Sequence, residues 1–215
     1  MERYKIKKIL FIFDSRATFS YSANVIKQIK KGKIKYQTLI TGNYLDKKFG
    51  VDLNIFKKYK IKIHSKVRFR SSNIKKYSWS YYLGEYIKSF SKKISIINPD
   101  LIVLTGDRAE TLAACISATY MNIPIAHIQA GDKSGHVDDV ARAAISKMAH
   151  IHFASCEDSV RRLKNFGEDK KRIFNVGAPQ LDDIYKFLKE KKFKNFNIKS
   201  KKIVIIFHPV LNEVK

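Results

Sequence analysis

The densest group of chemically capable side chains lies in a polar stretch at residues 126–139. It holds two glycines, two histidines and three acids. Imidazoles and carboxylates move protons in many catalysed reactions, and so many ionisable groups directly after an apolar run usually mark a site. Two plainer interpretations stay open, in which Asp138 or Asp139 caps the following helix and His127 is a hydrogen-bonded core residue. The candidates from this stretch are His127, Gln129, Asp132 and Asp138.

A carboxylate and a guanidinium stand side by side at Asp107 and Arg108, directly after the apolar run 101–105. This pair could transfer a proton and bind an anion at a strand-to-helix turn. Asp107 and Glu110 have the spacing of a capping box, which would explain both acids without any function. The sequence alone leaves these two interpretations equally open.

A third polar group follows the first apolar run, where Ser15, Arg16 and Ser20 lie at the start of a predicted helix. Backbone N–H groups and the helix dipole favour a phosphate at such a position, and a cation adds to the attraction. A plain Ser15 N-cap beside a solvated Arg16 would fit the same residues. Further on, Gly42 lies in a turn that could let the backbone approach a ligand closely, and an ordinary turn is the plainer interpretation, which we prefer.

The elements that must position these residues alternate regularly along the chain. Apolar, β-branched runs alternate with helix-length amphipathic segments, which predicts an α/β fold with a parallel sheet and helices on both faces. Ligands bind outside the carboxyl ends of such strands, where the three polar groups fall. We expect strands at 8–14, 36–41, 61–69, 101–105, 124–128, 151–153, 172–176 and 202–207, and helices at 17–31, 79–97, 108–121, 140–149, 158–166 and 180–188.

The domain organisation that we expect is a Rossmann-like N-terminal domain over 1–188, a lysine-rich connector over 189–201 and, at 202–215, the first strand of a second domain. A strand that opens a new unit without its helix suggests that this domain is truncated. His208 lies directly after that last predicted strand.

Composition narrows the function classes. The formal charge of +24 is the excess of 43 basic residues over 19 acids. Of the basic residues 34 are lysines, scattered along the chain, and only nine are arginines, whereas nucleic-acid sites favour clustered arginine. We therefore expect no nucleic-acid partner, although an anionic small substrate would be attracted.

The apolar runs are only as long as strands. We therefore expect no membrane-spanning segment and no leader, and a cytoplasmic protein. Cys115 and Cys156 have neither disulfide-framework nor metal-ligand spacing, so we expect no metal.

Several motifs in one order resemble the hydrolysing UDP-N-acetylglucosamine 2-epimerases. This resemblance implies a two-domain, glycosyltransferase-B-like architecture of which the chain supplies the N-terminal domain. It also implies a UDP-linked amino sugar as substrate, no cofactor, and a homo-oligomer in the full-length form. The motifs are at 15–17, 106–112, 122–132, 144–153, 176–182 and 208–210.

The resemblance also implies a reaction and roles. UDP is eliminated after proton abstraction at C2 of the sugar, and water then adds to the resulting glycal to give the C2-inverted sugar, as in sialic acid-type precursor synthesis. Asp107 and Asp138 match acids important for catalysis, and His127 matches a histidine needed for activity. The matched substrate and nucleotide contacts are Arg16, Ser20, Arg108, Arg142 and His208.

The chain departs from the family pattern at several site positions. Gln129 stands where a glutamate is usual, so Asp132 or Asp138 would take its role or the activity would differ. A 2,4-diacetamido-trideoxy sugar nucleotide is an alternative substrate, and a non-catalytic sugar-nucleotide-binding fragment is the runner-up. The other departures are Thr18 for an acid, Tyr44 and Thr105 for histidines, and Ala143 for the histidine after the motif arginine.

Overall fold

The computed structural model describes residues 6–46, 53–68, 78–135, 138–190 and 205. Within these residues seven strands form one parallel sheet in the order β3-β2-β1-β4-β5-β6-β7. The chain order reverses between the neighbouring strands β1 and β4, and such a switch point opens a crevice at the carboxyl edge of a parallel sheet. The strands are β1 (Lys8–Phe13), β2 (Lys35–Ile40), β3 (Ser65–Lys66), β4 (Leu101–Thr105), β5 (Ile125–Ile128), β6 (Ile151–Ala154) and β7 (Ile173–Asn175).

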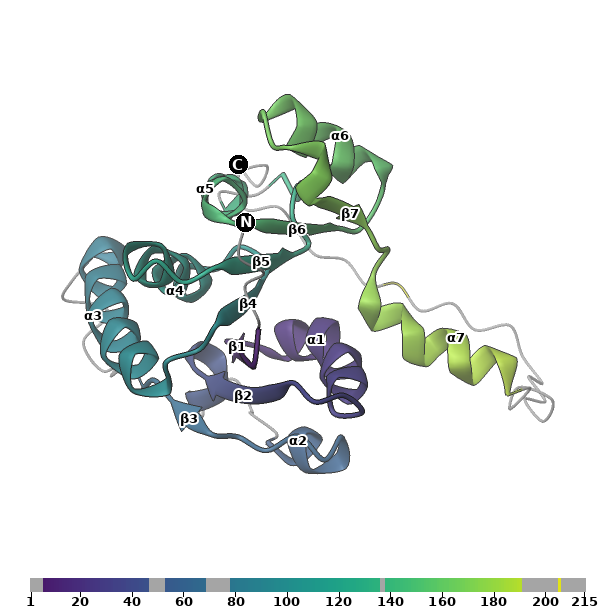
Figure 1. Cartoon of the computed structure of the whole chain (residues 1–215), viewed down its shortest axis with the longest axis horizontal. Coiled ribbons are helices and arrows are strands. Elements are labelled where there is room, and N and C mark those ends of the chain that lie inside the picture. Colours follow the sequence, from purple (N-terminus) through teal and green to yellow (C-terminus); the bar gives the residue numbers. More distant parts are fainter. Residues whose placement is uncertain (1–5, 47–52, 69–77, 136–137, 191–204, 206–215) are drawn as a thin grey trace.

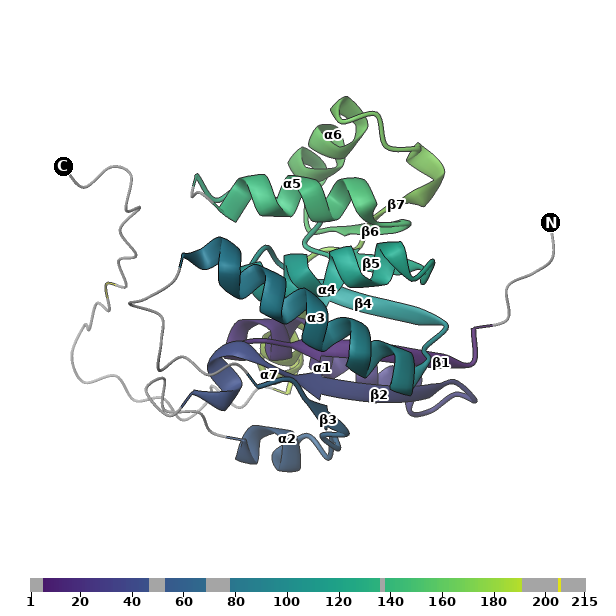
Figure 2. The same ribbon diagram turned by 90° about the vertical axis from the view of Figure 1, so that its left-hand side faces the viewer.

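Helices cover both faces of the sheet. Figure 1 shows α3, α4 and α5 on one side of the strands and α1 and α7 on the other, and Figure 2 views the sheet from the α3–α5 side. The helices are α1 (Arg16–Ile29), α2 (Asn54–Lys58), α3 (Trp79–Ile97), α4 (Ala109–Tyr120), α5 (Asp138–Met148), α6 (Glu157–Asn165) and α7 (Asp182–Lys189), with short 3₁₀ turns η1 (Gly42–Leu45), η4 (Lys170–Arg172) and η5 (Pro179–Leu181).

Alternation along β1 shows how the sequence builds two cores. Leu10 and Ile12 are buried among residues of α3, α4 and α5, whereas Phe11 and Phe13 point to the opposite face, where Phe19 of α1 is buried. Successive side chains of a strand point to opposite faces, so a central strand of a covered sheet must be apolar at every position. That is the pattern from Ile9 to Phe13, all buried.

The predicted fold class is confirmed, and most predicted elements lie within one or two residues of the observed ones. Three details differ. The strand expected at 61–69 is only Ser65–Lys66, because it pairs with β2 at two positions on the edge of the sheet. Helix α2 was not predicted, since it is five residues long and buries only Phe56. The helix expected from residue 180 starts as the 3₁₀ turn Pro179–Leu181.

The domain boundaries stay a prediction. The boundary placed at 188 falls within the last turn of α7, which ends at Lys189. Almost all of the connector and of the final predicted strand lies outside the described residues, and so does His208.

Three glycines at the carboxyl edge adopt a backbone conformation that residues with side chains rarely adopt. Gly42, Gly106 and Gly131 have positive φ angles of 53°, 79° and 75°. A Cβ on Gly131 would lie 2.4 Å from the carbonyl oxygen of Ser159, so only glycine fits at that turn. Gln129 also has a positive φ, 63°, which is unusual for a residue with a side chain.

Candidate functional site

Asp107 and Arg142 form an ion pair across the carboxyl ends of β4 and β5. The Nη2 group of Arg142 donates to Oδ2 of Asp107, and its Nη1 group donates to the carbonyl oxygen of Gln129 at 3.3 Å. Arg142 comes from α5 and is only 8% exposed. One guanidinium thus joins the turn after β4 to the turn after β5, which brings three of the expected site residues together.

The electrostatics of Asp107 suit proton transfer. Burial raises the pKa of its carboxyl group and outweighs the opposing charge of Arg142, while Asp138 raises it further. Burial acts to lower the pKa of Arg108, but the charges of Glu110 and Asp14 outweigh it and raise the pKa, with a smaller contribution from Asp138. The charge of Asp138 therefore acts on both residues after β4, which supports the expectation that Asp107 and Asp138 serve one site. Their approach to a common cavity stays a prediction.

The capping-box interpretation of Asp107 does not match the local structure. Helix α4 begins at Ala109, its N-cap residue is Arg108, and no side chain caps it by hydrogen bonding. Asp107 lies before the cap and is paired with Arg142 instead. Asp138 is the first residue of α5, where an acid also interacts favourably with the helix dipole.

Arg108 lies at the switch point between β1 and β4 among oxygen atoms from three segments. Its Nε atom is 3.4 Å from Oε2 of Glu110 and 4.0 Å from Oδ2 of Asp14. Its Nη2 group donates to Oδ1 of Asn43 at 3.5 Å. The side chain is 37% exposed, whereas those of Asp14 and Glu110 are almost fully buried. Solvent, or a ligand at the carboxyl edge, can therefore reach the guanidinium.

The N-terminus of α1 also lies at this edge. Arg16 is the first residue of the helix and is exposed, and its charge acts on buried Tyr44 of η1. Ser15 is the N-cap residue, as the plainer interpretation expected. The hydroxyl of Ser20 is exposed and donates to the carbonyl oxygen of Ala17 at 2.7 Å. Arg16 and Arg108 therefore flank the switch point, and both are partly or fully open to solvent.

His127 is completely buried. Its Nε2 is 2.8 Å from the carbonyl oxygen of Gly106, and its Nδ1 is 3.1 Å from Oγ of Ser146. A carbonyl can only accept, so Nε2 carries the proton and Nδ1 accepts from the serine hydroxyl. Burial lowers the pKa of the ring to about 3. This geometry matches the core interpretation of His127, which would act on the site by fixing Gly106 beside Asp107.

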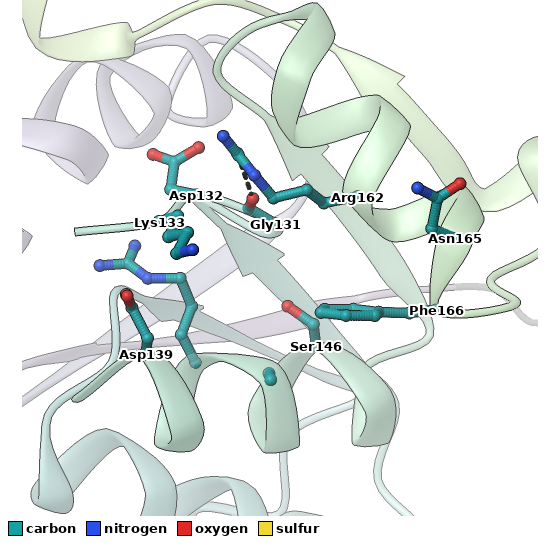
Figure 3. Close-up of a pocket in the computed structure, with 10 residues that line it drawn as sticks. Gly131, Asp132, Lys133, Asp139, Ser146, Arg162, Asn165 and Phe166 are labelled. Carbon is teal, nitrogen blue, oxygen red and sulfur yellow. Dashed lines mark hydrogen bonds between the residues drawn. The ribbon is translucent and has the colours of Figure 1, made fainter. Parts of the chain in front are cut away.

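Asp132 is held by two serine hydroxyls. Oδ1 accepts from Ser159 at 2.6 Å and also from Ser155. The carboxylate borders a cavity of about 420 Å³ between α5 and α6, and Figure 3 shows Asp132 and Arg162 on one wall and Asp139 and Ser146 on the other. Arg162 donates to the carbonyl oxygen of Gly131 at 2.9 Å. The cavity extends the charged edge away from the switch point.

Sequence reasoning missed Asp14 and its cluster. Asp14 directly follows β1 and is buried, accepts from Thr111 at 2.8 Å, and lies beside Arg108. Its position directly after an apolar run was the available signal, but its partners on α4 are about a hundred residues away in sequence. Among the residues that the structure describes, no group of three or more histidines, cysteines or acids could hold a metal ion, and no helix could span a membrane.

The parallel sheet, its switch point and the charged carboxyl edge define a Rossmann-like domain of the glycosyltransferase-B type. Solved structures show the same fold. The UDP-GlcNAc 2-epimerase of Neisseria meningitidis bound to UDP-GlcNAc superposes with a TM-score of 0.75 at 23% identity over 87% of this chain and 51% of that one. That of Methanocaldococcus jannaschii in complex with UDP-GlcNAc and UDP gives 0.74 at 22%, over 88% and 51%.

Sequence comparison then gives the family. The model of the UDP-N-acetylglucosamine 2-epimerase family matches residues 27–215, and the chain belongs to that family. It is 35% identical over 97% of its length to the UDP-N,N'-diacetylbacillosamine 2-epimerase (hydrolyzing) of Legionella pneumophila, and 31% identical to the GDP/UDP-N,N'-diacetylbacillosamine 2-epimerase (hydrolyzing) of Campylobacter jejuni. The chain spans only 57% and 56% of these relatives' lengths.

Proposed function

We propose that this domain forms one wall of the active site of a hydrolysing 2-epimerase that acts on a UDP-linked acetamido sugar. The observation that carries the proposal is the joined edge of β4 and β5, where Asp107 is partly buried, paired with Arg142 and influenced by Asp138. Family membership and the names of the most similar relatives support the reaction type.

The proposed chemistry needs two proton transfers and one departing anion. A base removes the proton from C2, the C1–O bond breaks, and UDP leaves with the bonding electrons. Water then adds its hydroxyl to C1, and an acid returns a proton to C2 on the opposite face. Asp107 and Asp138 are proposed for these transfers, because burial and like charge keep a carboxyl group protonated to higher pH.

The departing diphosphate needs cations at a position that water does not fully screen. Arg16 and Arg108 lie at the ends of β1 and β4, on either side of the switch point, and both precede or begin helices. Backbone N–H groups and guanidinium groups together favour phosphate oxygens there. Ser20 and His208 are proposed as further nucleotide contacts, and Arg142 as a substrate contact that also holds Asp107.

Gln129 bears on whether the domain is catalytic. A side-chain amide cannot accept a proton at neutral pH, and Gln129 contacts the Tyr21 hydroxyl instead. Asp132 lies three residues later and has a carboxylate oriented by Ser155 and Ser159. We propose that Asp132 supplies the acidic group that Gln129 lacks. The second hypothesis is that, with Gln129 in place of the usual glutamate, the domain binds a sugar nucleotide without catalysing a reaction.

Two UDP-linked sugars are proposed as substrates, and one assay distinguishes them. UDP-N-acetylglucosamine would yield N-acetylmannosamine and UDP, whereas a UDP-2,4-diacetamido-trideoxy sugar would yield the corresponding diacetamido mannose-type sugar. The names of the two relatives compared above favour the second. Purified protein should be incubated with each, and UDP and free sugar measured. Release of UDP from neither substrate, both by this chain and by a protein that spans the relatives' full length, would favour the non-catalytic interpretation.

A further inference from the structure

The cluster at the end of β1 contains more negative than positive charge. Two buried carboxyl groups, those of Asp14 and Glu110, share the single guanidinium of Arg108. If both acids were ionised, the group formed by Asp14, Glu110 and Arg108 would carry one net negative charge, beside the exposed Arg16 of α1. That charge would repel a diphosphate from the cation proposed to bind it.

The surroundings of Asp14 are built for a carboxyl group. Thr111 donates to Oδ2 at 2.8 Å, and the Thr18 hydroxyl is 3.3 Å from Oδ1. Gly42 makes room on the β2 side, because a Cβ there would lie 2.7 Å from Oε1 of Glu110 and 3.1 Å from the Asp14 carbonyl oxygen. Buried polar groups with such partners are positioned rather than incidental.

We infer that Asp14 is a positioning residue that, with Glu110, holds the Arg108 guanidinium at the switch point and releases it to an arriving diphosphate by taking up a proton. The proton comes from solvent, and no bond other than O–H forms. The cluster then changes from net negative to neutral while Arg108 pairs with the phosphate oxygens. This inference rests on the proposed function, because Arg108 is a proposed diphosphate contact.

The titration behaviour of Asp14 agrees with this geometry. Burial, followed by the charge of Glu110, raises its pKa to about 6, while Arg108 and Thr111 act in the opposite direction. Among the described residues Asp14 also acts on Tyr44 of η1 and Tyr86 of α3, and burial raises the pKa of both phenols. Both therefore stay neutral while Asp14 titrates. The exposed Arg16 of α1 acts on the same Tyr44 with the opposite sign. An added anion beside Arg108 should raise the pKa of Asp14 further.

The test is to follow the chemical shift of the Asp14 side-chain carboxyl carbon by NMR as a function of pH. This resonance can be assigned through the backbone of Asp14, so the assignment itself needs no variant. Without ligand, Arg108→Gln should raise the midpoint and Glu110→Gln should lower it. Saturating pyrophosphate should raise the wild-type midpoint by about one unit, which corresponds to a tenfold linkage. A midpoint that responds neither to Arg108→Gln nor to pyrophosphate would overturn the inference.

Calorimetric binding of pyrophosphate gives the second readout, with Asp14→Asn as the matched variant because its amide oxygen can still accept from Thr111. Between pH 5 and 7.5, the affinity of the wild type for pyrophosphate should fall about tenfold more than the affinity of Asp14→Asn does, because Asp14 ionises across that window. Pyrophosphate itself also titrates, but its titration affects both proteins equally and cancels when the two affinities are compared. Equal pH profiles contradict the inference alone. Pyrophosphate binding that is absent, or unchanged by Arg108→Gln, contradicts the diphosphate role proposed for Arg108.

Discussion

At the scale of single residues, the proposed proton transfers depend on Asp107 and Asp138. Asp107→Asn and Asp138→Asn should each lower kcat by about 10²-fold or more with little change in KM, because general acid–base groups act in the transition state. Steady-state kinetics on the full-length enzyme would measure this. Asp158→Asn, at an exposed ion pair on α6, is the control and should keep normal turnover. Near-normal kcat in either site variant would show that another group moves the protons.

Substitutions of His127 distinguish a positioning role of this residue from a catalytic role. His127→Ala should destabilise the domain by about 2–4 kcal/mol, because it leaves the Gly106 carbonyl and the Ser146 hydroxyl unpaired in a buried cavity. His127→Gln should cost less, since its amide can still donate to Gly106. Urea unfolding measures both free energies. A catalytic His127 would instead lose turnover in His127→Gln with stability unchanged.

The buried ring also predicts a pH dependence of stability. The pKa of His127 falls from its ordinary 6.5 to about 3 on folding, so between these values the unfolded chain binds a proton that the folded chain does not. The free energy of unfolding should therefore decrease as pH falls from about 6.5 toward 3. His127→Gln should show a shallower decrease over that window. An identical slope in both proteins would mean that the ring is protonated in the fold.

At the scale of elements, Glu168 ties the α6–β7 connection to α5 and β6. The carboxylate is 7% exposed and bonds to Lys147 at 2.9 Å and to His152 at 3.1 Å. Burial acts to raise its pKa, but the Lys147 hydrogen bond and the nearby charges outweigh it, so the pKa is lowered. This contribution to stability is present above the ordinary carboxyl pKa and is lost as pH falls through the lowered value.

Glu168→Gln should therefore lower the free energy of unfolding at pH 7 by about 1–3 kcal/mol, because Lys147 and Arg172 lose their shared partner. Asp158→Asn, which breaks an ion pair with both side chains more than half exposed, should change it by about 0.5 kcal/mol or less. Thermal or urea unfolding at pH 7 compares them. Equal effects of the two substitutions would mean that the buried network adds nothing.

Sequence periodicity predicted the elements better than their contacts. Long apolar runs such as 101–105 and amphipathic helices such as 79–97 were predicted at their observed bounds, because burial on a sheet or helix face leaves a regular pattern. Helix α2 was missed because a five-residue helix with one buried side chain leaves almost no pattern. The partnership of Asp107 with Arg142 spans 35 residues and depends on how α5 returns to the sheet, which spacing does not specify.

At the scale of the whole molecule, the chain covers a little over half of its relatives' length. We propose that this domain forms only one wall of the active site, so that uridine and part of the diphosphate would be bound by residues outside it. Remote binding energy positions the reacting carbon in such enzymes. We therefore expect the 215-residue chain alone to release UDP far more slowly than a relative of full length, such as the Legionella pneumophila enzyme, does from the same substrate. Equal rates would mean that this domain holds the complete active site.

We propose that this edge of the sheet belongs to an enzyme that removes and replaces the C2 proton of a UDP-linked acetamido sugar. The most direct measurement is turnover in D₂O by the product of the whole reading frame, with mass spectrometry and NMR of the released sugar. Elimination and hydration predict one deuterium at C2, an inverted C2 centre and one UDP for each sugar, all lost in Asp107→Asn. Release of UDP with protium and the original configuration at C2 would contradict the account.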